Sequence, residues 1–256
     1  MIKLSACCVT YNRPHLLGEM IDSFEKQNYP KQACELIILD DANQYGDIRG
    51  ENWQIVSFPR RFASLGEKRN ACVSLTNPGF THIVVADDDD IYLPWWLECH
   101  AKNFERGAKW SFASSIFWSE RNRIVSQWQH HDEEWIMHPA HAFEKKTFWD
   151  CGGYPHMAWK EDREFFERLR HAGIDHEDSL SCLEEHRRVP YLIHRRNLRW
   201  KHRHTTGLPL EEYRSFEPEL PRVSLEIGWK KDYLEEAREF IKQRNTEGES
   251  HVDGNV

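Results

Sequence analysis

Residues 83–94 read IVVADDDDIYLP, so a short apolar run passes at once into four aspartates and then into a second apolar run. An apolar run of this length is typical of a buried strand. Four like charges beside buried residues repel one another unless an opposite charge compensates them. Mg²⁺ or Mn²⁺ would do so, because these cations bind carboxylate oxygens together with phosphates. The stretch therefore predicts a divalent-cation site for a diphosphate compound, and the alternative is a solvated acidic loop.

Strands and helices are expected to alternate before this stretch. The expected strands are 4–9, 35–39, 54–58 and 81–86, and the expected helices are 16–24 and 66–75. This alternation predicts the α/β class, with a Rossmann-like, mostly parallel sheet flanked by helices. Asn12 is expected to cap the first helix, because its side chain can accept from an unpaired backbone N–H. Pro14 is expected in the first turn.

The pattern after residue 95 is less regular. Helices are expected at 95–106, 161–172 and 230–242, and strands at 110–118, 124–128 and 189–193, the first two strands pairing as a hairpin. No linker composition interrupts the chain, which favours one main domain at 1–205. We call residues 1–95 the first half of this domain and residues 96–205 the second half. A helical extension at 206–246 and a disordered tail at 247–256 are expected to follow.

Composition excludes several classes of protein. Of the 256 residues, 39% are hydrophobic, enough for a sizeable core and against wholesale disorder. Lys plus Arg number 34 and Asp plus Glu 42, and the net charge of −8 argues against a dominant nucleic-acid surface. We find no signal peptide and no transmembrane segment. The seven cysteines lack Cys-x-x-Cys spacing, which disfavours a zinc ribbon or a disulfide framework and predicts a cytoplasmic protein.

Three of the expected strands end in polar clusters. These clusters are Thr10–Asn12, Asp40–Asp41 and Asp87–Asp90. Ligands of open α/β sheets bind beyond the carboxyl ends of the strands, so we expect the three clusters on one rim. A tyrosine ring there can stack on a nucleobase, and a carboxylate can accept a hydrogen bond from a base N–H or a ribose O–H. The alternative for each cluster is an ordinary helix cap or turn.

Several segments, in order along the chain, resemble those of the family-two glycosyltransferases with the GT-A fold. They are Val9–Pro14, Leu36–Asn43, Gly66–Ala71, Ala86–Pro94, Gly152–Tyr154 and Glu161–Phe166. The resemblance implies an inverting enzyme that moves a sugar from a nucleoside diphosphate sugar to an acceptor hydroxyl. It also implies a UDP-sugar as the favoured donor and assistance by Mn²⁺ or Mg²⁺.

The resemblance implies roles for individual residues. The nucleotide site would comprise Thr10, Tyr11, Asn12, Arg13, Asp41, Lys68, Arg69 and Asp88. The metal ligands would be Asp89 and Asp87, with His194 as a third candidate. Asp162 would be the general base that takes the proton of the acceptor hydroxyl in a single displacement. Trp159 and Glu161 would lie on the acceptor side.

Several of these roles have a simpler structural alternative. Asp162 opens an expected helix, where the helix dipole alone favours an acidic residue. Lys68 and Arg69 would bind phosphate at a helix N-terminus or belong to a solvated helix face. A lone histidine such as His194 is often structural.

The segment Arg187–Arg203 is strongly basic. It holds seven Lys or Arg residues and no acidic residue, so the remainder of the chain carries −8 − 7 = −15. Histidines 194, 202 and 204 lie within or beside it. We expect this segment to close over the diphosphate. Its charge would also suit a polyanionic acceptor, such as nucleic acid or a phosphate-rich glycan, and the acceptor class stays open.

Two other functions compete with glycosyl transfer. A metal-dependent nucleotidyltransferase would need a glycine-rich, lysine-bearing loop after the first strand, and Thr10–Pro14 contains no glycine. A non-catalytic carbohydrate-binding protein would use some of the eleven tryptophans. It gives no reason for the acidic run Asp87–Asp90 or for Asp162.

Overall fold

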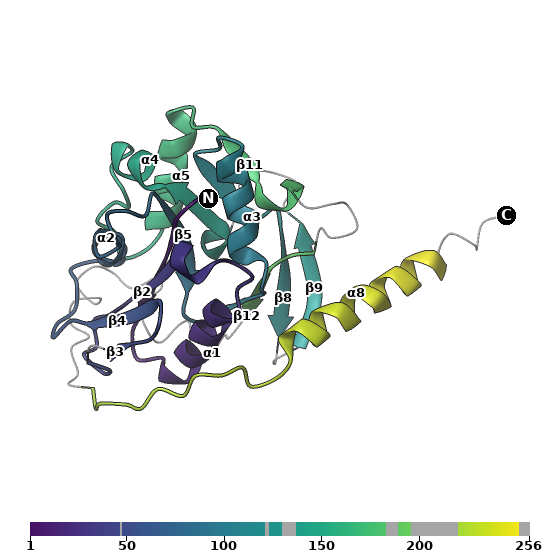
Figure 1. Ribbon diagram of the computed structural model, residues 1–256, viewed down its shortest axis with the longest axis horizontal. Helices are drawn as coiled ribbons and strands as arrows, with labels where there is room; N and C mark the ends of the chain where they lie inside the picture. The colour runs from purple at the N-terminus through teal and green to yellow at the C-terminus, as the bar shows by residue number, and fades with distance from the viewer. Residues whose placement is uncertain (47, 121–122, 130–136, 183–188, 196–219, 251–256) are drawn as a thin grey trace.

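Figure 1 shows the computed structural model, which describes residues 1–46, 48–120, 123–129, 137–182, 189–195 and 220–250. The first half forms β1 (Leu4–Thr10), α1 (Pro14–Glu25), η1 (Lys31–Ala33), β2 (Cys34–Asp40), β3 (Ile48–Arg49), β4 (Trp53–Ser57), α2 (Leu65–Ser74), β5 (His82–Asp87) and β6 (Ile91–Tyr92). Every strand and helix expected before residue 90 is present, with ends shifted by one or two residues. The two-residue strands β3 and β6 were not predicted.

The remaining described residues form less regular structure. Its elements are α3 (Trp96–Glu105), β7 (Trp110–Phe112), β8 (Ser115–Glu120), β9 (Arg123–Gln129), η3 (His138–Ala140), β10 (His141–Glu144), α4 (Lys145–Asp150), α5 (Glu161–His171), β11 (His176–Asp178), η4 (Ser179–Cys182), β12 (Leu192–Arg195) and α8 (Tyr233–Ser250). The hairpin of β8 and β9 is confirmed. The short strands β10 and β11 and the helix α4 were not predicted.

Two sheets organise the described residues. The larger has eight strands in the order β11-β7-β10-β5-β1-β2-β4-β3, and the smaller has the order β6-β12-β8-β9. The neighbours β5, β1, β2 and β4 run parallel, whereas β10 is antiparallel to both of its partners. The predicted α/β class with a mostly parallel sheet is therefore confirmed.

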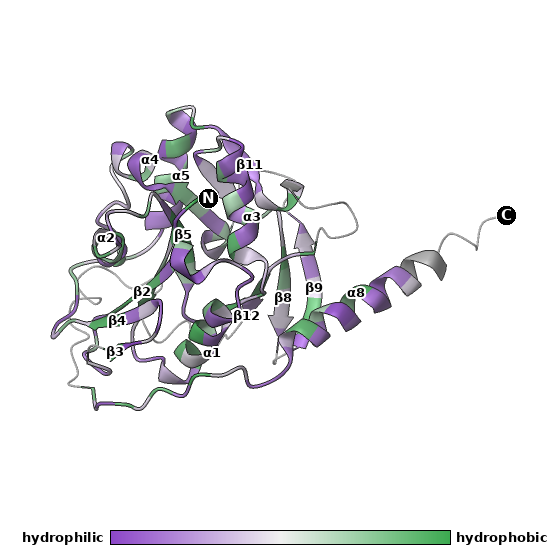
Figure 2. Ribbon diagram, in the orientation of Figure 1, coloured by the Kyte–Doolittle hydropathy of each residue, from purple (hydrophilic) through white to green (hydrophobic). Residues whose placement is uncertain are grey.

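The parallel strands are buried because helices cover them. Leu4, Leu36 and Val84 in β1, β2 and β5 have no exposed surface. Strands buried on both faces carry continuous apolar runs, which is why the sequence located them (Figure 2). The helix α1 contributes Leu17 and Met20 to the same core.

The predicted cap of α1 is wrong. Arg13 is the N-cap residue, no side chain caps the helix, and Pro14 lies in the first turn as expected. Asn12 has a φ of +53°, the left-handed conformation that asparagine tolerates better than most residues. The Asn12 side chain contacts Gln44 instead of the helix N-terminus, because Gln44 Nε2 donates to Asn12 Oδ1 at 3.5 Å.

The strand expected at 110–118 is divided between the two sheets. β7 belongs to the large sheet and β8 to the small one. The chain turns between them at Ala113 and Ser114, because Ala113 N donates to Ala140 O and the Ser114 hydroxyl donates to Asp178 Oδ2 at 2.6 Å. Apolar spacing continues through this turn, so the sequence pattern does not show it.

The helix α5 is anchored by aromatic packing. Phe165, Phe166 and Leu169 are buried, as predicted, in a cluster that also contains Trp110 and Phe143. The rings of Phe143 and Phe165 meet edge to face with centroids 5.2 Å apart. This packing holds the first turn of α5 at a defined place.

The C-terminal region reaches back to the first half of the domain. Residues 220–232 run past α1 before α8 begins, and α8 packs against β8 and β9 before its C-terminal end projects beyond the small sheet (Figure 1). α8 includes residues 247–250, which the sequence analysis assigned to a disordered tail, while residues 251–256 lie outside the described part. Within the described residues, no helix combines the length and the apolar character needed to cross a membrane.

Candidate active site

The ends of β1, β2 and β5 bring the three predicted polar clusters onto one rim. Thr10 pairs with Asp40 in the β1–β2 register, and Val9 pairs with Asp87 in the β1–β5 register. The side chains at these strand ends therefore lie side by side, as the sequence predicted.

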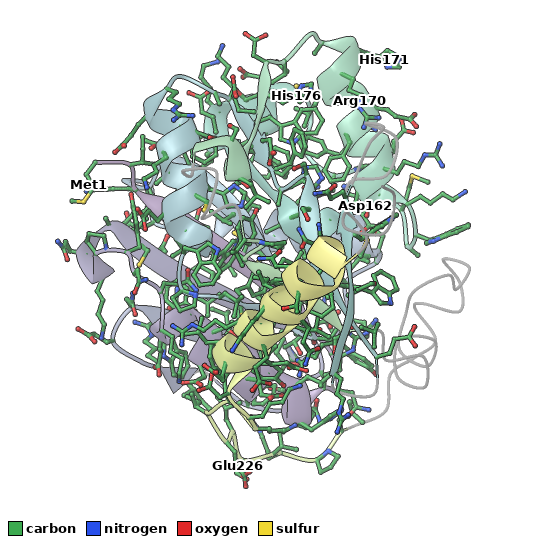
Figure 3. All side chains as sticks on the ribbon, turned by 90° about the vertical axis from the view of Figure 1, so that its right-hand side faces the viewer. Met1, Asp162, Arg170, His171, His176 and Glu226 are labelled. Carbon is green, nitrogen blue, oxygen red and sulfur yellow. The ribbon has the colours of Figure 1, made fainter. Side chains whose placement is uncertain are left out.

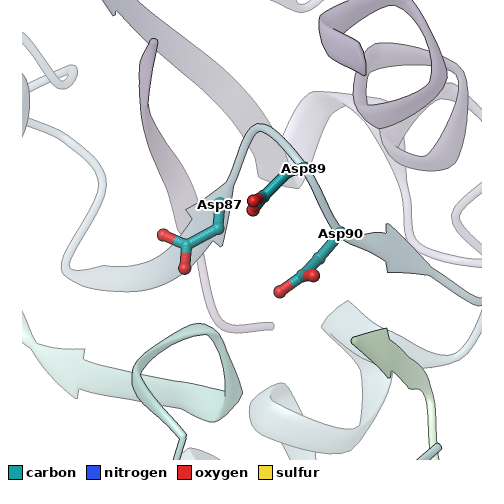
Figure 4. Close-up of side chains that lie close together, drawn as sticks. All are labelled: Asp87, Asp89 and Asp90. Atoms are coloured by element: carbon teal, nitrogen blue, oxygen red, sulfur yellow. The ribbon is translucent and has the colours of Figure 1, made fainter. Parts of the chain in front are cut away.

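Three carboxylates of the acidic run form a compact group. Asp87, Asp89 and Asp90 each offer an oxygen, and these oxygens lie within 4.8 Å of one another (Figure 4). Hard oxygen donors at this spacing suit Mg²⁺ or Mn²⁺. The structure thus brings together the predicted ligands Asp87 and Asp89 and adds Asp90, which the sequence analysis did not assign.

Asp88 points to different partners. It accepts a hydrogen bond from the Thr10 hydroxyl at 2.7 Å and from Arg13 Nη1 at 2.7 Å. Arg13 Nη1 also lies 3.4 Å from Asp89 Oδ2. The charge of Asp88, opposed by burial, raises the pKa of Arg13 above its usual range. Thr10, Arg13 and Asp88, all predicted for the nucleotide site, are therefore one connected group.

His194 contacts the acidic group through Asp90. Its Nδ1 lies 3.0 Å from Asp90 Oδ1, and its ring lies 5.0 Å from that of Trp118. The structure thus places this predicted ligand beside the carboxylate group, against the carboxylate that the sequence analysis left out.

Asp41 is buried between two cations. Lys68 Nζ pairs with Asp41 Oδ1 and donates to the backbone oxygen of Thr10 at 2.6 Å. Arg61 Nη1 lies 3.4 Å from Asp41, and its guanidinium stacks 3.6 Å from the centre of the Tyr11 ring. Burial lowers the pKa of Lys68, an effect that the charge of Asp41 opposes. The predicted residues Tyr11, Asp41 and Lys68 therefore meet at the end of β2.

The preceding aspartate has a structural role. Asp40 accepts hydrogen bonds from the backbone N–H groups of Ala42 and Gln44, both at 2.8 Å, and from the Ser57 hydroxyl. These bonds fix the turn after β2, whereas Asp41 is paired with Lys68 and Arg61.

Arg69 joins the acidic group to the start of α5. Its Nε lies 3.0 Å from Glu161 Oε1, and its Nη1 lies 3.6 Å from Asp87 Oδ1 and 2.8 Å from His138 Nδ1. Burial alone would lower the pKa of Arg69, but the charges of Glu161 and Asp87 raise it. Burial raises the pKa of Glu161, an effect that Arg69 opposes. The two ends of the predicted site are thus linked through one buried guanidinium.

Backbone contacts bring α2 against the loop that precedes α5. Gly66 N donates to Met157 O at 3.1 Å, and a Cβ on Gly66 would lie 1.8 Å from Pro155 O, so only glycine fits. The Asn70 amide completes the contact, donating to Tyr154 O at 2.8 Å and accepting from Tyr154 N at 2.9 Å. The predicted motifs at 66–71 and 152–154 therefore meet in space.

Asp162 lies in the first turn of α5, at the end opposite Arg170 and His171 (Figure 3). Lys160, just before the helix, has a φ of +63°, an uncommon conformation for lysine that the surrounding structure must impose. Asp162 is partly exposed, and Trp159 is 52% exposed with Lys160 Nζ 4.2 Å from its ring centre. Among the predicted acceptor-side residues, Trp159 reaches solvent and Glu161 is buried.

The sequence did not predict three of the residues at the site, which are Asp90, Arg61 and His138. Asp90 was present in the run, but its register was ambiguous. Arg61 follows β4, whose carboxyl end lies on the same rim, so the rim argument applied to β4 would have found it. His138 carries no local signal, because only the fold brings it within 3.4 Å of Asp87. Of the basic segment, only residues 189–195 lie within the described part of the chain.

The sequence model of "Glycosyl transferase family 2" matches residues 5–170, about two thirds of the chain. The chain belongs to glycosyl transferase family 2. No curated protein sequence matches this family 2 chain significantly.

Solved structures share the GT-A fold of this family 2 chain. One is TarS 1-349 of S. aureus in complex with UDP-GlcNAc, with a TM-score of 0.59 and 16% identity, over 77% of this chain and 59% of that one. Another is the mannosyltransferase PcManGT from Pyrobaculum calidifontis in complex with GDP-Man and Mn²⁺, with a TM-score of 0.52 and 12% identity, over 69% of this chain and 54% of that one. The chain thus spans under two thirds of either structure, and at these identities the likeness is one of fold.

Proposed function

We propose that this family 2 chain is an inverting glycosyltransferase that moves a sugar from a UDP-sugar to an acceptor hydroxyl. The observation that carries the proposal is the group formed by Asp87, Asp89 and Asp90 at the end of β5, linked through Arg69 to the helix start that carries Asp162. A donor-side cation site and an acceptor-side base are the two parts that such a transfer needs. The nucleotide sugars in the two similar structures support the donor class.

The donor nucleotide would lie along the ends of β1 and β2. Tyr11 would stack on the base, and Asp41 would accept a hydrogen bond from a base N–H. Asp88, held by Thr10 and Arg13, would lie at the ribose. The remaining members of the proposed nucleotide site are Asn12, Lys68 and Arg69. Lys68 fixes the position of Asp41, which is the geometry a specific base contact requires.

Mn²⁺ or Mg²⁺ is the proposed cofactor. Asp87 and Asp89 would hold it, with Asp90 completing the carboxylate group and His194 beside Asp90. The bound cation would supply positive charge that stabilises the departing diphosphate. The Mn²⁺ in the mannosyltransferase complex agrees with this assignment.

Asp162 is the proposed general base. It would take the proton of the acceptor hydroxyl while that oxygen forms a bond to the anomeric carbon. The bond from the anomeric carbon to the diphosphate oxygen breaks, and its electron pair leaves with the nucleoside diphosphate. Attack from the face opposite the leaving group inverts the anomeric configuration. Partial exposure of Asp162 keeps its carboxylate within reach of an incoming acceptor.

The acceptor would approach over Trp159 and the start of α5. An exposed indole ring can stack on a sugar, and this ring precedes the proposed base by three residues. A glycan is therefore the favoured acceptor, and a polyanion bound by the segment Arg187–Arg203 is the alternative. We also propose a cytoplasmic location, from the cysteine content.

Release of nucleoside diphosphate from a panel of sugar nucleotides, with Mn²⁺ and with a chelator, tests the proposal. We expect Mn²⁺-dependent release from a UDP-sugar, and NMR of the product should show an inverted anomeric centre. Release with retained configuration would contradict the inverting mechanism. Absence of release from every sugar nucleotide, in a protein that binds UDP, would contradict glycosyl transfer.

A further inference from the structure

Arg195 contacts the acidic turn at Asp89 and Asp90. The antiparallel pairing of β6 and β12 brings the end of β12 beside Asp89 and Asp90. Arg195 Nε donates to the backbone oxygen of Asp89 at 2.6 Å, and Arg195 N donates to Asp90 Oδ1 at 3.1 Å. Both the main chain and the side chain of the turn are thus fixed by one residue, which is only 7% exposed.

Glu19 of α1 holds the other end of Arg195. Arg195 Nη1 donates to Glu19 Oε2 at 2.6 Å, and Glu19 is 2% exposed. Burial favours the neutral form of Glu19, but the charge of Arg195 and a hydrogen bond from Tyr233 outweigh it and lower its pKa. A buried ion pair of this kind needs further hydrogen bonds to offset the loss of solvation.

The C-terminal segment supplies those hydrogen bonds. The Tyr233 hydroxyl donates to Glu19 Oε1 at 2.7 Å, and Lys230 N donates to the same oxygen at 3.1 Å. Trp229 N donates to Asp22 Oδ2 at 2.7 Å, and a Cβ on Gly18 would lie 1.7 Å from Glu226 O. The segment is therefore packed along one face of α1 and hydrogen-bonded to it.

A continuous set of contacts runs from the C-terminal segment to the acidic turn. Tyr233 and Lys230 contact Glu19, Glu19 contacts Arg195, and Arg195 contacts Asp89 and Asp90. Arg195, Lys230 and Tyr233 all lie beyond residue 170, where the match to the family ends. These contacts are thus a property of this chain that the family match does not include.

We propose that Arg195 is a positioning residue that sets the geometry of the Asp89–Asp90 turn, and that Glu19 and Tyr233 hold Arg195 in that position. The C-terminal segment then supports the cation site indirectly, through Glu19 and Arg195. This inference rests on the proposed function, because that function places the cation on Asp87 and Asp89.

Two variants test the proposal in the full chain. Glu19→Gln keeps the shape but removes the charge that holds Arg195, and Tyr233→Phe removes only the hydroxyl. Their matched controls are Glu235→Gln on the exposed face of α8 and Tyr29→Phe, whose hydroxyl donates to Ile2 O far from the acidic turn. Mn²⁺ affinity is measured by calorimetry below each melting temperature, and hydrogen exchange is measured at the amides of residues 88–92.

We expect Glu19→Gln to weaken Mn²⁺ binding about tenfold to a hundredfold, the usual cost of losing a partner that orients a metal ligand. Tyr233→Phe should weaken it less and in the same direction, and both variants should exchange faster at residues 88–92. The double variant should lose little beyond Glu19→Gln alone, because the two residues act through one contact. A merely structural role would lower the melting temperature, as in Tyr29→Phe, with no change in Mn²⁺ affinity.

Two results would overturn the proposal. One is wild-type Mn²⁺ affinity in folded Glu19→Gln and Tyr233→Phe. The other is wild-type exchange at residues 88–92 in both variants. If the wild-type protein itself binds no Mn²⁺, the proposed metal assistance fails, and the exchange comparison alone still decides whether Arg195 positions the turn.

Discussion

In the first half of the domain, two buried carboxylates are paired with cations. Asp41 contacts Lys68, and Asp88 contacts Arg13. In the second half, some buried polar groups are held by neutral partners instead. His100 Nδ1 lies 2.8 Å from the Ser111 hydroxyl and its Nε2 lies 2.8 Å from the Tyr191 hydroxyl, and neither contact requires a charge.

Under the proposed function, this comparison corresponds to a fixed donor side and an accessible acceptor side. Asp87, Asp88 and Asp89 each have an arginine against them, so these carboxylates are oriented before any ligand arrives. Asp162 and Trp159 instead reach solvent on a helix start anchored by aromatic rings. Substitutions on the donor side should therefore affect stability and binding together, whereas substitutions of Asp162 should affect turnover alone.

The largest expected effect is on turnover. Asp162→Asn keeps the shape and removes the proton acceptor, so kcat should fall about a hundredfold to ten-thousandfold. UDP affinity and the melting temperature should change little, because the side chain is partly exposed and, under the proposed function, would contact the acceptor. Steady-state kinetics measure kcat, and calorimetry measures UDP affinity and the melting temperature. Glu164→Gln, in the same helix turn, is the control. Full activity in Asp162→Asn would remove Asp162 from the mechanism and leave it as an acid favoured by the helix dipole.

The next effect is on stability. Lys68→Met leaves the buried carboxylate of Asp41 without its main cation and should cost about 3–5 kcal/mol in the free energy of unfolding. Lys146→Met is the matched control, because Lys146 pairs with Asp150 in solvent and such pairs contribute at most about 1 kcal/mol. Denaturant unfolding compares the two. Equal losses would show that the first half does not depend on its buried ion pairs.

A smaller effect is expected on cation-dependent binding. Asp89→Ala removes one of the three grouped carboxylates and should weaken UDP binding in Mn²⁺ by about tenfold or more. The difference between Mn²⁺ and a chelator should largely disappear. Asp150→Ala, at an exposed aspartate, controls for net charge. If the wild-type protein binds UDP equally well in chelator, the metal assignment is wrong.

The smallest effect is on the pH dependence of stability in the second half. Burial lowers the pKa of His100 to about 3, whereas an unfolded histidine titrates near about 6.5. Between these values the unfolded chain binds a proton that the folded chain does not. Stability present above pH ~6.5 is therefore lost as the pH falls, by up to about 1.4 kcal/mol per pH unit.

Urea unfolding at pH 7 and pH 5 measures this loss. His100→Gln lowers stability at pH 7 but should reduce the difference between the two pH values. An unchanged difference in the variant would show that His100 does not contribute to the acid sensitivity.

The sequence predicted the first half of the domain far better than the second. Buried parallel strands such as β2 and β5 need long apolar runs, and those runs are visible without a structure. β10 and β11 are three or four residues long and depend on pairing with distant strands. The turn at Ala113 and Ser114 is set by Ala140 and Asp178, which no local pattern can indicate.

The residues of the candidate site also differ in how well the sequence predicted them. The motif residues were assigned because strand ends and helix starts carry local signals. Asp87 and Asp89 do lie together, and Arg69 does link to Glu161. Local sequence patterns could not predict which side chains contact these residues. His138 beside Asp87 and Glu19 beside Arg195 arise only when segments far apart in the chain are packed.

The contact between Glu19 and Tyr233 also has a consequence for the order in which the chain is synthesised and folds. The two residues are 214 positions apart, so at about 5–20 residues per second the ribosome makes Tyr233 roughly 10–40 s after Glu19. For that interval α1 exists without the groups that complete the surroundings of its buried glutamate. A nascent or truncated chain that lacks residues 229–233 therefore carries all the motifs of the rim, while the hydrogen bonds from Lys230 and Tyr233 to Glu19 remain unmade. Under our proposal, the support that these hydrogen bonds give to the Asp89–Asp90 turn is present only once synthesis has passed residue 233.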